Sequence, residues 1–127
     1  MVLPTYNESG NIHSTLEKIF LNQIMLHGYK LSVLVVDDNS PDNTAELVKG
    51  LMTKYSGLSL ISSEKKGLGD AYKRGINYAL KNLKADLIIQ MDADGQHDPR
   101  LIPKFIGLTN NYDVIIGSRF VEGGSAP

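Results

Sequence analysis

The chain has 127 residues, of which 42% are hydrophobic and 21% are charged, and it contains no cysteine. These values are typical of one globular domain with a single core, and the lack of cysteine excludes disulfides and thiolate metal sites. The net charge of -1 provides no excess of cations to hold a phosphate backbone, so nucleic acid is not an expected partner. No hydrophobic run approaches the roughly 20 residues that span a bilayer, so a membrane-anchoring segment or subunit would lie outside this chain.

Short β-branched runs alternate with helical patterns along the chain. Runs typical of buried strands occupy residues 1–3, 31–36, 58–61, 87–91 and 114–116. Hydrophobic residues at helical spacing predict helices within residues 12–24, 48–55, 72–83 and 101–106. This alternation predicts an α/β fold with a mainly parallel sheet flanked by helices on both faces, in which ligands bind beyond the carboxyl ends of the strands.

Three segments carry signals for helix starts. Ser40-Pro41 and Asp98-Pro99 each place a capping side chain before a proline that suits the first helical position. The spacing of Thr5 and Glu8 matches a capping box ahead of the first helix.

Both ends of the chain resemble interrupted structure. Residues 1–3 have the pattern of the last part of a strand broken by Pro4, and residues 122–127 trail into a loop without a closing element. We therefore expect a partial polypeptide, incomplete at its C-terminus, that lacks some of its functional residues.

Acidic and polar side chains follow the expected strands, although a parallel sheet has little structural need for so many acids at one edge. Helix capping explains Asp98 and contributes to the explanation of Asp42, because acids are favoured near helix N-termini. Capping does not explain Asp92 and Asp94, which precede the cap. The strand-end segments are residues 4–8, 37–40, 65–70, 92–97 and 117–119.

Asp92-Ala93-Asp94 is the most informative triplet. Residues i and i+2 leaving a strand point the same way, so the two carboxylates should converge and repel unless a cation lies between them. Mg²⁺ or Mn²⁺ suits such an all-oxygen set, Gln96 can add a third oxygen, and the small Ala93 lets a ligand approach the backbone. The alternative is an acidic turn before a capped helix. At a strand end in this fold, the triplet favours a metal site.

Other metal- and nucleotide-binding motifs do not fit this chain. An EF-hand beginning at Asp92 would need glycine and glutamate where His97 and Pro103 stand. Residues 4–8, after the first strand, lack the G-x-G-x-x-G pattern of a dinucleotide-binding fold, and no P-loop sequence occurs.

Taken together, the strand-end segments resemble family 2 glycosyltransferases, whose catalytic domain has the GT-A fold, and within that family the dolichyl-phosphate mannosyltransferases. The chain departs from the pattern of that group at Asn39 and Asn43, where glycine is usual. Asparagine tolerates left-handed backbone conformations, so the turn should survive. The resemblance is carried, in chain order, by residues 2–8 (VLPTYNE), 35–42 (VVDDNSPD), 65–72 (KKGLGDAY), 91–97 (MDADGQH) and 117–119 (GSR).

The resemblance implies a role for each matching residue. Residues 1–127 would form the nucleotide-sugar-binding part of a single catalytic domain. Asp94 and Arg119 would be catalytic, with Arg119 contacting the phosphate or sugar, and Asp92, Asp94 and Gln96 would hold Mg²⁺ or Mn²⁺. The implied nucleotide-sugar-binding residues are Pro4, Tyr6, Glu8, Val36, Asp38, Asp92, Ala93, Asp94 and Arg119.

Several of these residues also have simpler structural explanations. Tyr6 can pack under the first helix, Glu8 can complete the capping box, and Asp37 can brace its own turn. Lys65 and Lys66 are expected to be a solvated pair. Tyr72, Tyr78 and Phe105 are expected to pack in the core, and His13 and His27 to lie on helix surfaces. For His97, a supporting role near the site and simple exposure to solvent are equally expected.

The implied reaction is an inverting displacement at the anomeric carbon of a nucleoside-diphosphate sugar, in which a divalent ion acts as Lewis acid for the departing diphosphate. A lipid-phosphate acceptor at a membrane surface is already anionic and needs no strong base, which favours it over a hydroxyl acceptor. The expected hexosyl donor is GDP-mannose, the acceptor is dolichyl or another polyprenyl phosphate, and the location is the cytoplasmic face of the endoplasmic reticulum or plasma membrane. The isolated chain should show little or no transfer.

Three alternatives stay open. A family 2 enzyme could use another sugar donor or a saccharide hydroxyl as acceptor. The chain could instead belong to a catalytically incompetent module that binds nucleotides or nucleotide sugars. A nucleotidyltransferase is disfavoured, because the glycine-rich basic loop expected after the first strand is missing.

Overall fold

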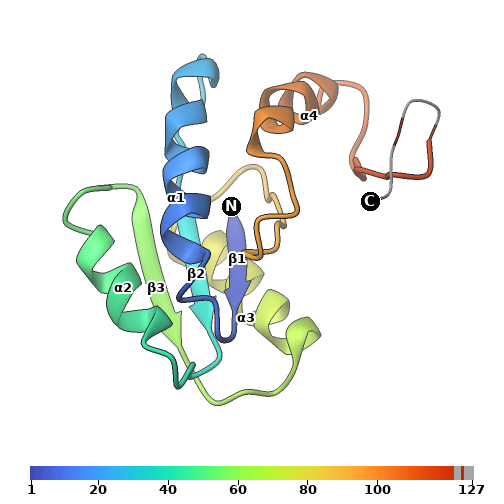
Figure 1. Ribbon diagram of the computed structural model, residues 1–127. Coiled ribbons are helices and arrows are strands. Elements are labelled where there is room, and N and C mark those ends of the chain that lie inside the picture. The colour runs from blue at the N-terminus through green and yellow to red at the C-terminus, as the bar shows by residue number, and fades with distance from the viewer. Residues whose placement is uncertain (122–123, 125–127) are drawn as a thin grey trace.

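The fold consists of a short parallel sheet with helices on both of its faces (Figure 1). The computed structural model describes residues 1–121 and residue 124. In chain order the elements are β1 (Val2–Thr5), α1 (Ile12–Leu21), the 3-10 helix η1 (Asn22–Met25), β2 (Val33–Asp37), α2 (Thr44–Leu51), β3 (Leu58–Ser62), α3 (Leu68–Lys81), the 3-10 helix η2 (Pro99–Leu101) and α4 (Ile102–Leu108).

β2 is the central strand of the sheet. It pairs in parallel with β1 on one side and with β3 on the other, so that Val2 lies opposite Leu34 and Val33 lies opposite Leu58. Every residue of β2 is buried, as expected for a strand that is covered on both faces. The last of these residues, Asp37, is therefore a carboxylate placed inside the fold.

β1 continues through Pro4, against the expectation that this proline interrupts the strand. Pro4 lies in register with Val36 of β2. On its other side, β1 meets residues 87–91 only at Val2. The missing N–H of Pro4 therefore faces an edge where no ladder hydrogen bond is lost.

The strand predicted at residues 87–91 is reduced to a single bridge to β1. The Val2 N–H donates to the Ile89 carbonyl at 2.8 Å, and the Met91 N–H donates to the Val2 carbonyl at 3.3 Å. A strand needs backbone hydrogen bonds to successive residues of a neighbouring strand, and here Val2 is the one residue of β1 that forms them. The segment nevertheless runs beside β1 in the place of a fourth strand, so it delivers Asp92 to the carboxyl edge of the sheet.

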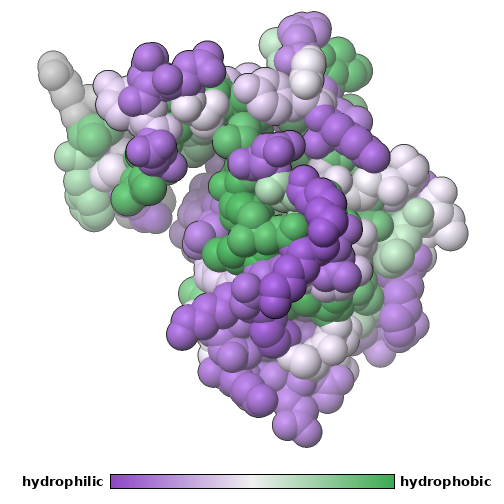
Figure 2. All heavy atoms as spheres, turned by 180° about the vertical axis from the view of Figure 1, so that it is seen from behind, coloured by the Kyte–Doolittle hydropathy of each residue, from purple (hydrophilic) through white to green (hydrophobic). Residues whose placement is uncertain are grey.

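The strand predicted at residues 114–116 is wrong. Val114 and Ile116 are 76% and 82% exposed, and the segment pairs with none of the strands in the described part of the chain. A hydrophobic run becomes a strand only where a neighbouring strand accepts its hydrogen bonds. Figure 1 shows this segment projecting away from the sheet, and Figure 2 shows hydrophobic side chains gathered on it.

Each face of the sheet has its own hydrophobic core. Leu3 and Val35 point to the face covered by α1, α2 and α4. Val2 and Val36 point to the opposite face, which is covered by α3. This division follows from the alternation of side chains along a strand, and it confirms the predicted layered arrangement.

Of the predicted helix starts, only the one at Asp98 is confirmed. The Asp98 side chain accepts the Arg100 N–H at 3.0 Å, with proline at the first position of η2. α2 begins at Thr44 and not after Ser40-Pro41, because the Ser40 side chain is bound to Asp37 and is not available as a cap.

The capping box predicted from Thr5 and Glu8 does not form. α1 begins at Ile12 with Asn11 at its N-cap position. The Thr5 hydroxyl donates to Asp37 instead, and Glu8 accepts a hydrogen bond from the Asn11 side chain. Both side chains therefore serve the loop between β1 and α1 and not the first turn of the helix.

α3 approaches the sheet most closely at Gly75. A Cβ atom added to this buried glycine would lie 2.3 Å from Cγ1 of Val2 and 2.9 Å from Cγ2 of Val36. Both contacts are too short for real carbon atoms, and both partners are β-branched residues with little freedom on a strand. The absence of a side chain at Gly75 therefore sets the spacing between α3 and the sheet.

Within the described residues, no helix combines the length and the hydrophobicity that a membrane span requires.

Replacing Gly75 with alanine is expected to lower the free energy of unfolding by about 1 kcal/mol or more, since overpacking by one methyl typically costs about 1–3 kcal/mol. Urea denaturation measures this change. Gly50→Ala is the matched control, because Gly50 lies on α2 with no atom within 4 Å of an added Cβ. That variant should instead gain roughly 0.5–1 kcal/mol from helix propensity. Equal stability of the two variants would contradict the close approach.

Candidate functional site

The loop after β1 is joined to the loop after β2 by the buried carboxylate of Asp37, which is 1% exposed. The hydroxyls of Thr5 and Ser40 donate to its Oδ1 at 2.9 and 2.6 Å, and the Ser40 N–H donates to its Oδ2 at 2.9 Å. Ser40 Oγ also accepts the Asn7 N–H at 3.0 Å. A buried carboxylate is tolerated when its oxygens are bonded in this way, so Asp37 braces its turn as predicted.

A second connection between the same two loops runs through Asp42 and Thr44. The Ser9 N–H donates to Asp42 Oδ2 at 2.9 Å, and the Glu8 N–H donates to Thr44 Oγ1 at 3.0 Å. The hydrogen bond from the Thr44 hydroxyl, with those from the Ser9 and Thr44 N–H groups, lowers the pKa of Asp42 to about 2. Asp42 therefore stays ionised above that pH and keeps both loops together.

The turn after β2 adopts the left-handed backbone conformations predicted for its asparagines. Asn39 has φ 55° and Asn43 has φ 67°. Asparagine is among the few residues other than glycine that enter this region readily. The two departures from the glycine-containing family pattern therefore leave the turn intact.

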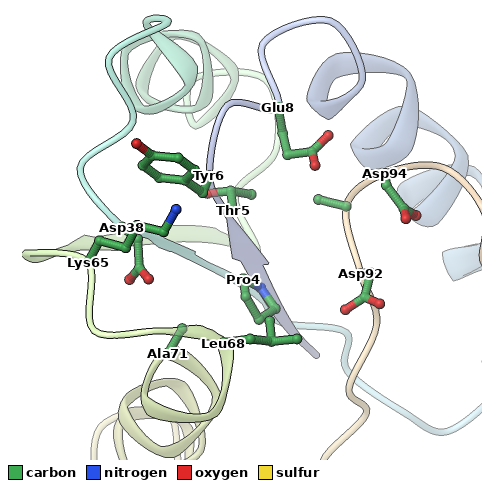
Figure 3. Close-up of a pocket in the computed structure, with 11 residues that line it drawn as sticks. Pro4, Thr5, Tyr6, Glu8, Asp38, Lys65, Leu68, Ala71, Asp92 and Asp94 are labelled. Carbon is green, nitrogen blue, oxygen red and sulfur yellow. The ribbon is translucent and has the colours of Figure 1, made fainter.

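A cleft of about 260 Å³ opens at the carboxyl edge of the sheet, between these loops, the start of α3 and the segment after residue 91. In Figure 3, Asp92 and Asp94 lie on one side of the cleft and Asp38 and Lys65 on the other, with the end of β1 between them. The lining residues are Pro4, Thr5, Tyr6, Glu8, Asp38, Lys65, Leu68, Ala71, Asp92, Ala93 and Asp94.

Asp38 is held in the side of the cleft by α3. Its carboxylate forms an ion pair with Arg74, and the Arg74 Nε also donates to Asp70 Oδ2 at 2.7 Å. Partial burial disfavours the charge of Arg74, but its hydrogen bonds to Asp70 and Asp38 raise its pKa. Asp38 is only 5% exposed, so this pairing supplies the counter-charge that its burial requires.

Tyr6 and Lys65 meet at the mouth of the cleft. The Lys65 Nζ lies 3.3 Å from the centroid of the Tyr6 ring, which is the geometry of a cation–π contact. Tyr6 is 40% exposed, so it does not pack beneath the first helix. Lys65 is solvent-exposed as predicted, but it also lines the cleft, whereas Lys66 does not.

The loop that carries Asp92 and Asp94 is anchored to both helix layers. On one side the Thr15 hydroxyl of α1 donates to the Ala93 carbonyl at 3.1 Å, and on the other the Tyr72 hydroxyl of α3 donates to Asp92 Oδ1 at 2.8 Å. The Gln96 N–H donates to Asp94 Oδ1 at 2.9 Å. These contacts place both carboxylates at the same cleft, with the small, buried Ala93 between them.

The two carboxylates fit a divalent cation that takes its other ligands from a substrate. Mg²⁺ is commonly bound through one or two carboxylates together with the phosphates of a nucleotide, and Asp92 and Asp94 each keep one oxygen outside the hydrogen bonds described above. In the part of the chain that the structure describes, no three His, Cys, Asp or Glu side chains are grouped closely enough to form a metal site. Phosphate oxygens of a bound nucleotide would thus supply the remaining ligands of the cation.

Three predicted site residues lie outside the cleft. Val36 is fully buried and faces Gly75 of α3. Gln96 lines a separate cleft beside the C-terminal end of α1. Arg119 is exposed on the segment that projects from the sheet (Figure 1).

Sequence reasoning did not assign Thr5, Lys65, Leu68 or Ala71 to the cleft, and it missed the groups of α3 that orient the cleft carboxylates. Lys65 and Ala71 belong to segment 65–72, which was recognised as family-like, but the sequence does not show which side chains of that segment face the cleft. Arg74 and Tyr72 follow at helical spacing, and the packing assigned to Tyr72 accounts for its ring but not for its hydroxyl. The signal that could have found them is a polar group on the helix face that packs against the sheet, because such a group needs a hydrogen-bond partner.

The chain belongs to glycosyl transferase family 2, which it matches over residues 1–126. It is 39% identical over 125 residues to a dolichol-phosphate mannosyltransferase of Pyrococcus furiosus, covering 98% of this chain and 34% of that protein. It is 35% identical over 124 residues to an undecaprenyl-phosphate mannosyltransferase of Micrococcus luteus, covering 97% of this chain and 49% of that protein. The chain thus spans between a third and a half of the length of these curated relatives.

Solved structures confirm the GT-A fold. A mannosyltransferase from Pyrobaculum calidifontis, in complex with GDP-Man and Mn²⁺, superimposes with a TM-score of 0.59 at 27% identity, over 83% of this chain and 30% of that chain. S. aureus TarS, in complex with UDP, superimposes with a TM-score of 0.59 at 19% identity, over 94% of this chain and 38% of that chain. The second likeness concerns the fold alone.

Replacing Asp37 with asparagine is expected to lower the free energy of unfolding by about 1–3 kcal/mol, because an amide NH₂ cannot accept the hydrogen bonds that the carboxylate takes. Urea denaturation measures the loss. Asp113→Asn makes the same chemical change at an exposed position and should stay within about 0.5 kcal/mol of the original protein. An unchanged Asp37 variant would refute the bracing role of this residue.

Proposed function

We propose that the protein is a metal-dependent inverting glycosyltransferase that transfers mannose from GDP-mannose to dolichyl phosphate or another polyprenyl phosphate. The observation that carries this proposal is the placement of Tyr6, Asp38, Asp92 and Asp94 around one cleft at the carboxyl edge of the sheet, in a family 2 chain. The similarity to two polyprenyl-phosphate mannosyltransferases supports the acceptor class. The likeness to a mannosyltransferase structure with GDP-Man and Mn²⁺ supports the donor and the ion.

In this proposal, residues 1–127 supply the donor-binding part of the catalytic domain. Tyr6 offers an exposed aromatic face and Asp38 an oriented carboxylate to the nucleoside, with Pro4 and Glu8 completing that side of the cleft. Val36 contributes indirectly, because its buried side chain packs near the end of β2, the strand that leads into Asp38.

Asp92 and Asp94 would bind Mg²⁺ or Mn²⁺ together with the donor diphosphate. The bound ion would act as a Lewis acid that stabilises the negative charge on the diphosphate as the bond to the sugar breaks. Gln96, predicted as a third ligand, lines a separate cleft, and its backbone N–H donates to the Asp94 carboxylate. Arg119 would supply further positive charge to the phosphate or sugar only if its segment folds toward the cleft.

A phosphate acceptor needs no general base, since its oxygen is already anionic when it attacks the anomeric carbon. A polyprenyl phosphate is presented at a membrane surface, so the protein would work at the cytoplasmic face of the endoplasmic reticulum or plasma membrane. Transfer by the whole protein from GDP-mannose to a short-chain polyprenyl phosphate, in the presence of Mn²⁺, tests this function. Transfer only to a saccharide hydroxyl would contradict the proposed acceptor, and transfer only from another sugar nucleotide would contradict the proposed donor.

A binding module without catalysis is the second candidate. It is favoured by the distance of the exposed Arg119 segment from the sheet, which leaves the cleft without one of its expected catalytic residues. Nucleotide-dependent thermal stabilisation without any transfer by the whole protein would support this candidate. A panel of nucleotide sugars, tested by thermal shift with Mg²⁺ and with Mn²⁺, also identifies the preferred base and sugar.

Asp94→Ala is expected to abolish the Mn²⁺-dependent part of GDP binding while leaving the melting temperature nearly unchanged, because Asp94 lies at the rim of the sheet and, among the described residues, binds only the Gln96 N–H. Calorimetry with and without Mn²⁺ measures the effect. Asp86→Ala removes an exposed acid outside the cleft and serves as control. Unchanged affinity of the Asp94 variant with Mn²⁺ would refute the assignment of this ligand.

Lys65→Ala is expected to weaken GDP binding about five-fold at low salt, since one unit-charge contact near water is worth about 1 kcal/mol. The difference should shrink as ionic strength rises. Lys66→Ala removes the same charge one residue later, outside the cleft, and should change affinity far less. If both variants bind alike, or if loss of Lys65 strengthens binding by freeing the Tyr6 ring, Lys65 does not contact the diphosphate.

A further inference from the structure

Tyr72 connects the packing of α3 to the acidic loop of the cleft. Its ring is half-buried in the core between α3 and the sheet. Its hydroxyl leaves that core and donates to Asp92 Oδ1 at 2.8 Å. The same side chain is therefore fixed at one end by the hydrophobic core and bound at the other to a carboxylate that lines the cleft.

Asp92 is also held by His97, through its backbone. The Asp92 N–H donates to His97 Nδ1 at 3.2 Å, so Nδ1 is the acceptor nitrogen and the neutral ring carries its proton on Nε2. Nε2 lies 4.0 Å from Asp92 Oδ2. The carboxylate thus has a phenol bound to one oxygen and an imidazole near the other.

Two carboxylates on one cleft, two residues apart, repel each other and favour rotation away from a shared ligand. A cationic partner would suppress the repulsion but would also neutralise the charge that attracts a metal ion. A tyrosine hydroxyl avoids this conflict, because it is a neutral donor that fixes one oxygen without adding charge. The 2.8 Å contact places the Tyr72 hydroxyl as a donor to this oxygen.

We propose that Tyr72 is a positioning residue that holds the Asp92 carboxylate in the orientation needed to bind a nucleoside diphosphate and its divalent ion. This inference rests on the proposed function, since it concerns the same cleft. It adds a residue of α3 to the binding machinery and assigns it a role through Asp92, without direct contact to the ligand. Loss of a hydrogen bond to a ligand-binding carboxylate typically weakens binding or activity about 10–100-fold.

The test compares Tyr72→Phe with Tyr78→Phe. Both tyrosines lie on α3 and pack in the same core, so each variant loses one hydroxyl from the same helix. Calorimetry measures the affinity for GDP in the presence of Mn²⁺, and for UDP in parallel. Tyr72→Phe should bind the preferred nucleotide about 10-fold more weakly or worse, Tyr78→Phe should bind like the original protein, and the two melting temperatures should be similar.

A double-mutant cycle shows whether Tyr72 acts through Asp92. Asp92→Ala removes the carboxylate that the Tyr72 hydroxyl binds, so Tyr72→Phe should have little further effect in that background. An equal loss of affinity from Tyr72→Phe in both backgrounds would overturn the proposal, as would equal binding by Tyr72→Phe and Tyr78→Phe. If the original protein bound neither GDP nor UDP with Mn²⁺, the proposed function itself would fail, which is a distinguishable result.

Discussion

The cleft depends on a carboxylate that no ligand would touch. Asp37 ends the central strand inside the fold, and its oxygens accept hydrogen bonds from Thr5 and from Ser40. Thr5 ends β1 and Ser40 lies on the loop after β2, so one buried charge holds together the two strand ends from which these cleft loops begin. Burying an ionised group without partners would be strongly unfavourable, so the loops are held in the arrangement that satisfies it.

α3 is both a covering helix and a source of orienting groups. Gly75 lets it approach the sheet closely enough that Arg74 reaches Asp38 and Tyr72 reaches Asp92. These carboxylates lie on opposite sides of the cleft (Figure 3). A shift of the helix away from the sheet would therefore disturb both sides at once, which links packing in the core to the geometry of the site.

The fold could be predicted from the sequence where a segment forms its hydrogen bonds locally, as in a helix, or where a strand is covered on both faces. The β2 run is buried on both faces and is confirmed, as are the cap at Asp98 and a helix at each predicted pattern, although α2 begins and ends four residues before the predicted range 48–55. The prediction is wrong for residues 114–116 and incomplete for 87–91, because strand formation requires a neighbour that a hydrophobic run does not specify. The capping predictions at Ser40 and Thr5 are wrong because Asp37, distant from Thr5 in sequence, binds their hydroxyls.

The sequence by itself determined the α/β class, the family and the gathering of acids at the carboxyl edge, because strand ends in a parallel sheet meet at one edge whatever their exact register. It also determined that Asn39 and Asn43 would preserve the turn, since backbone preference is a property of the residue itself. Only the tertiary structure decided that Lys65 faces Tyr6 and that the Tyr72 hydroxyl holds Asp92. Those contacts join segments far apart in the chain, and the spacing between α3 and the sheet places the second of them.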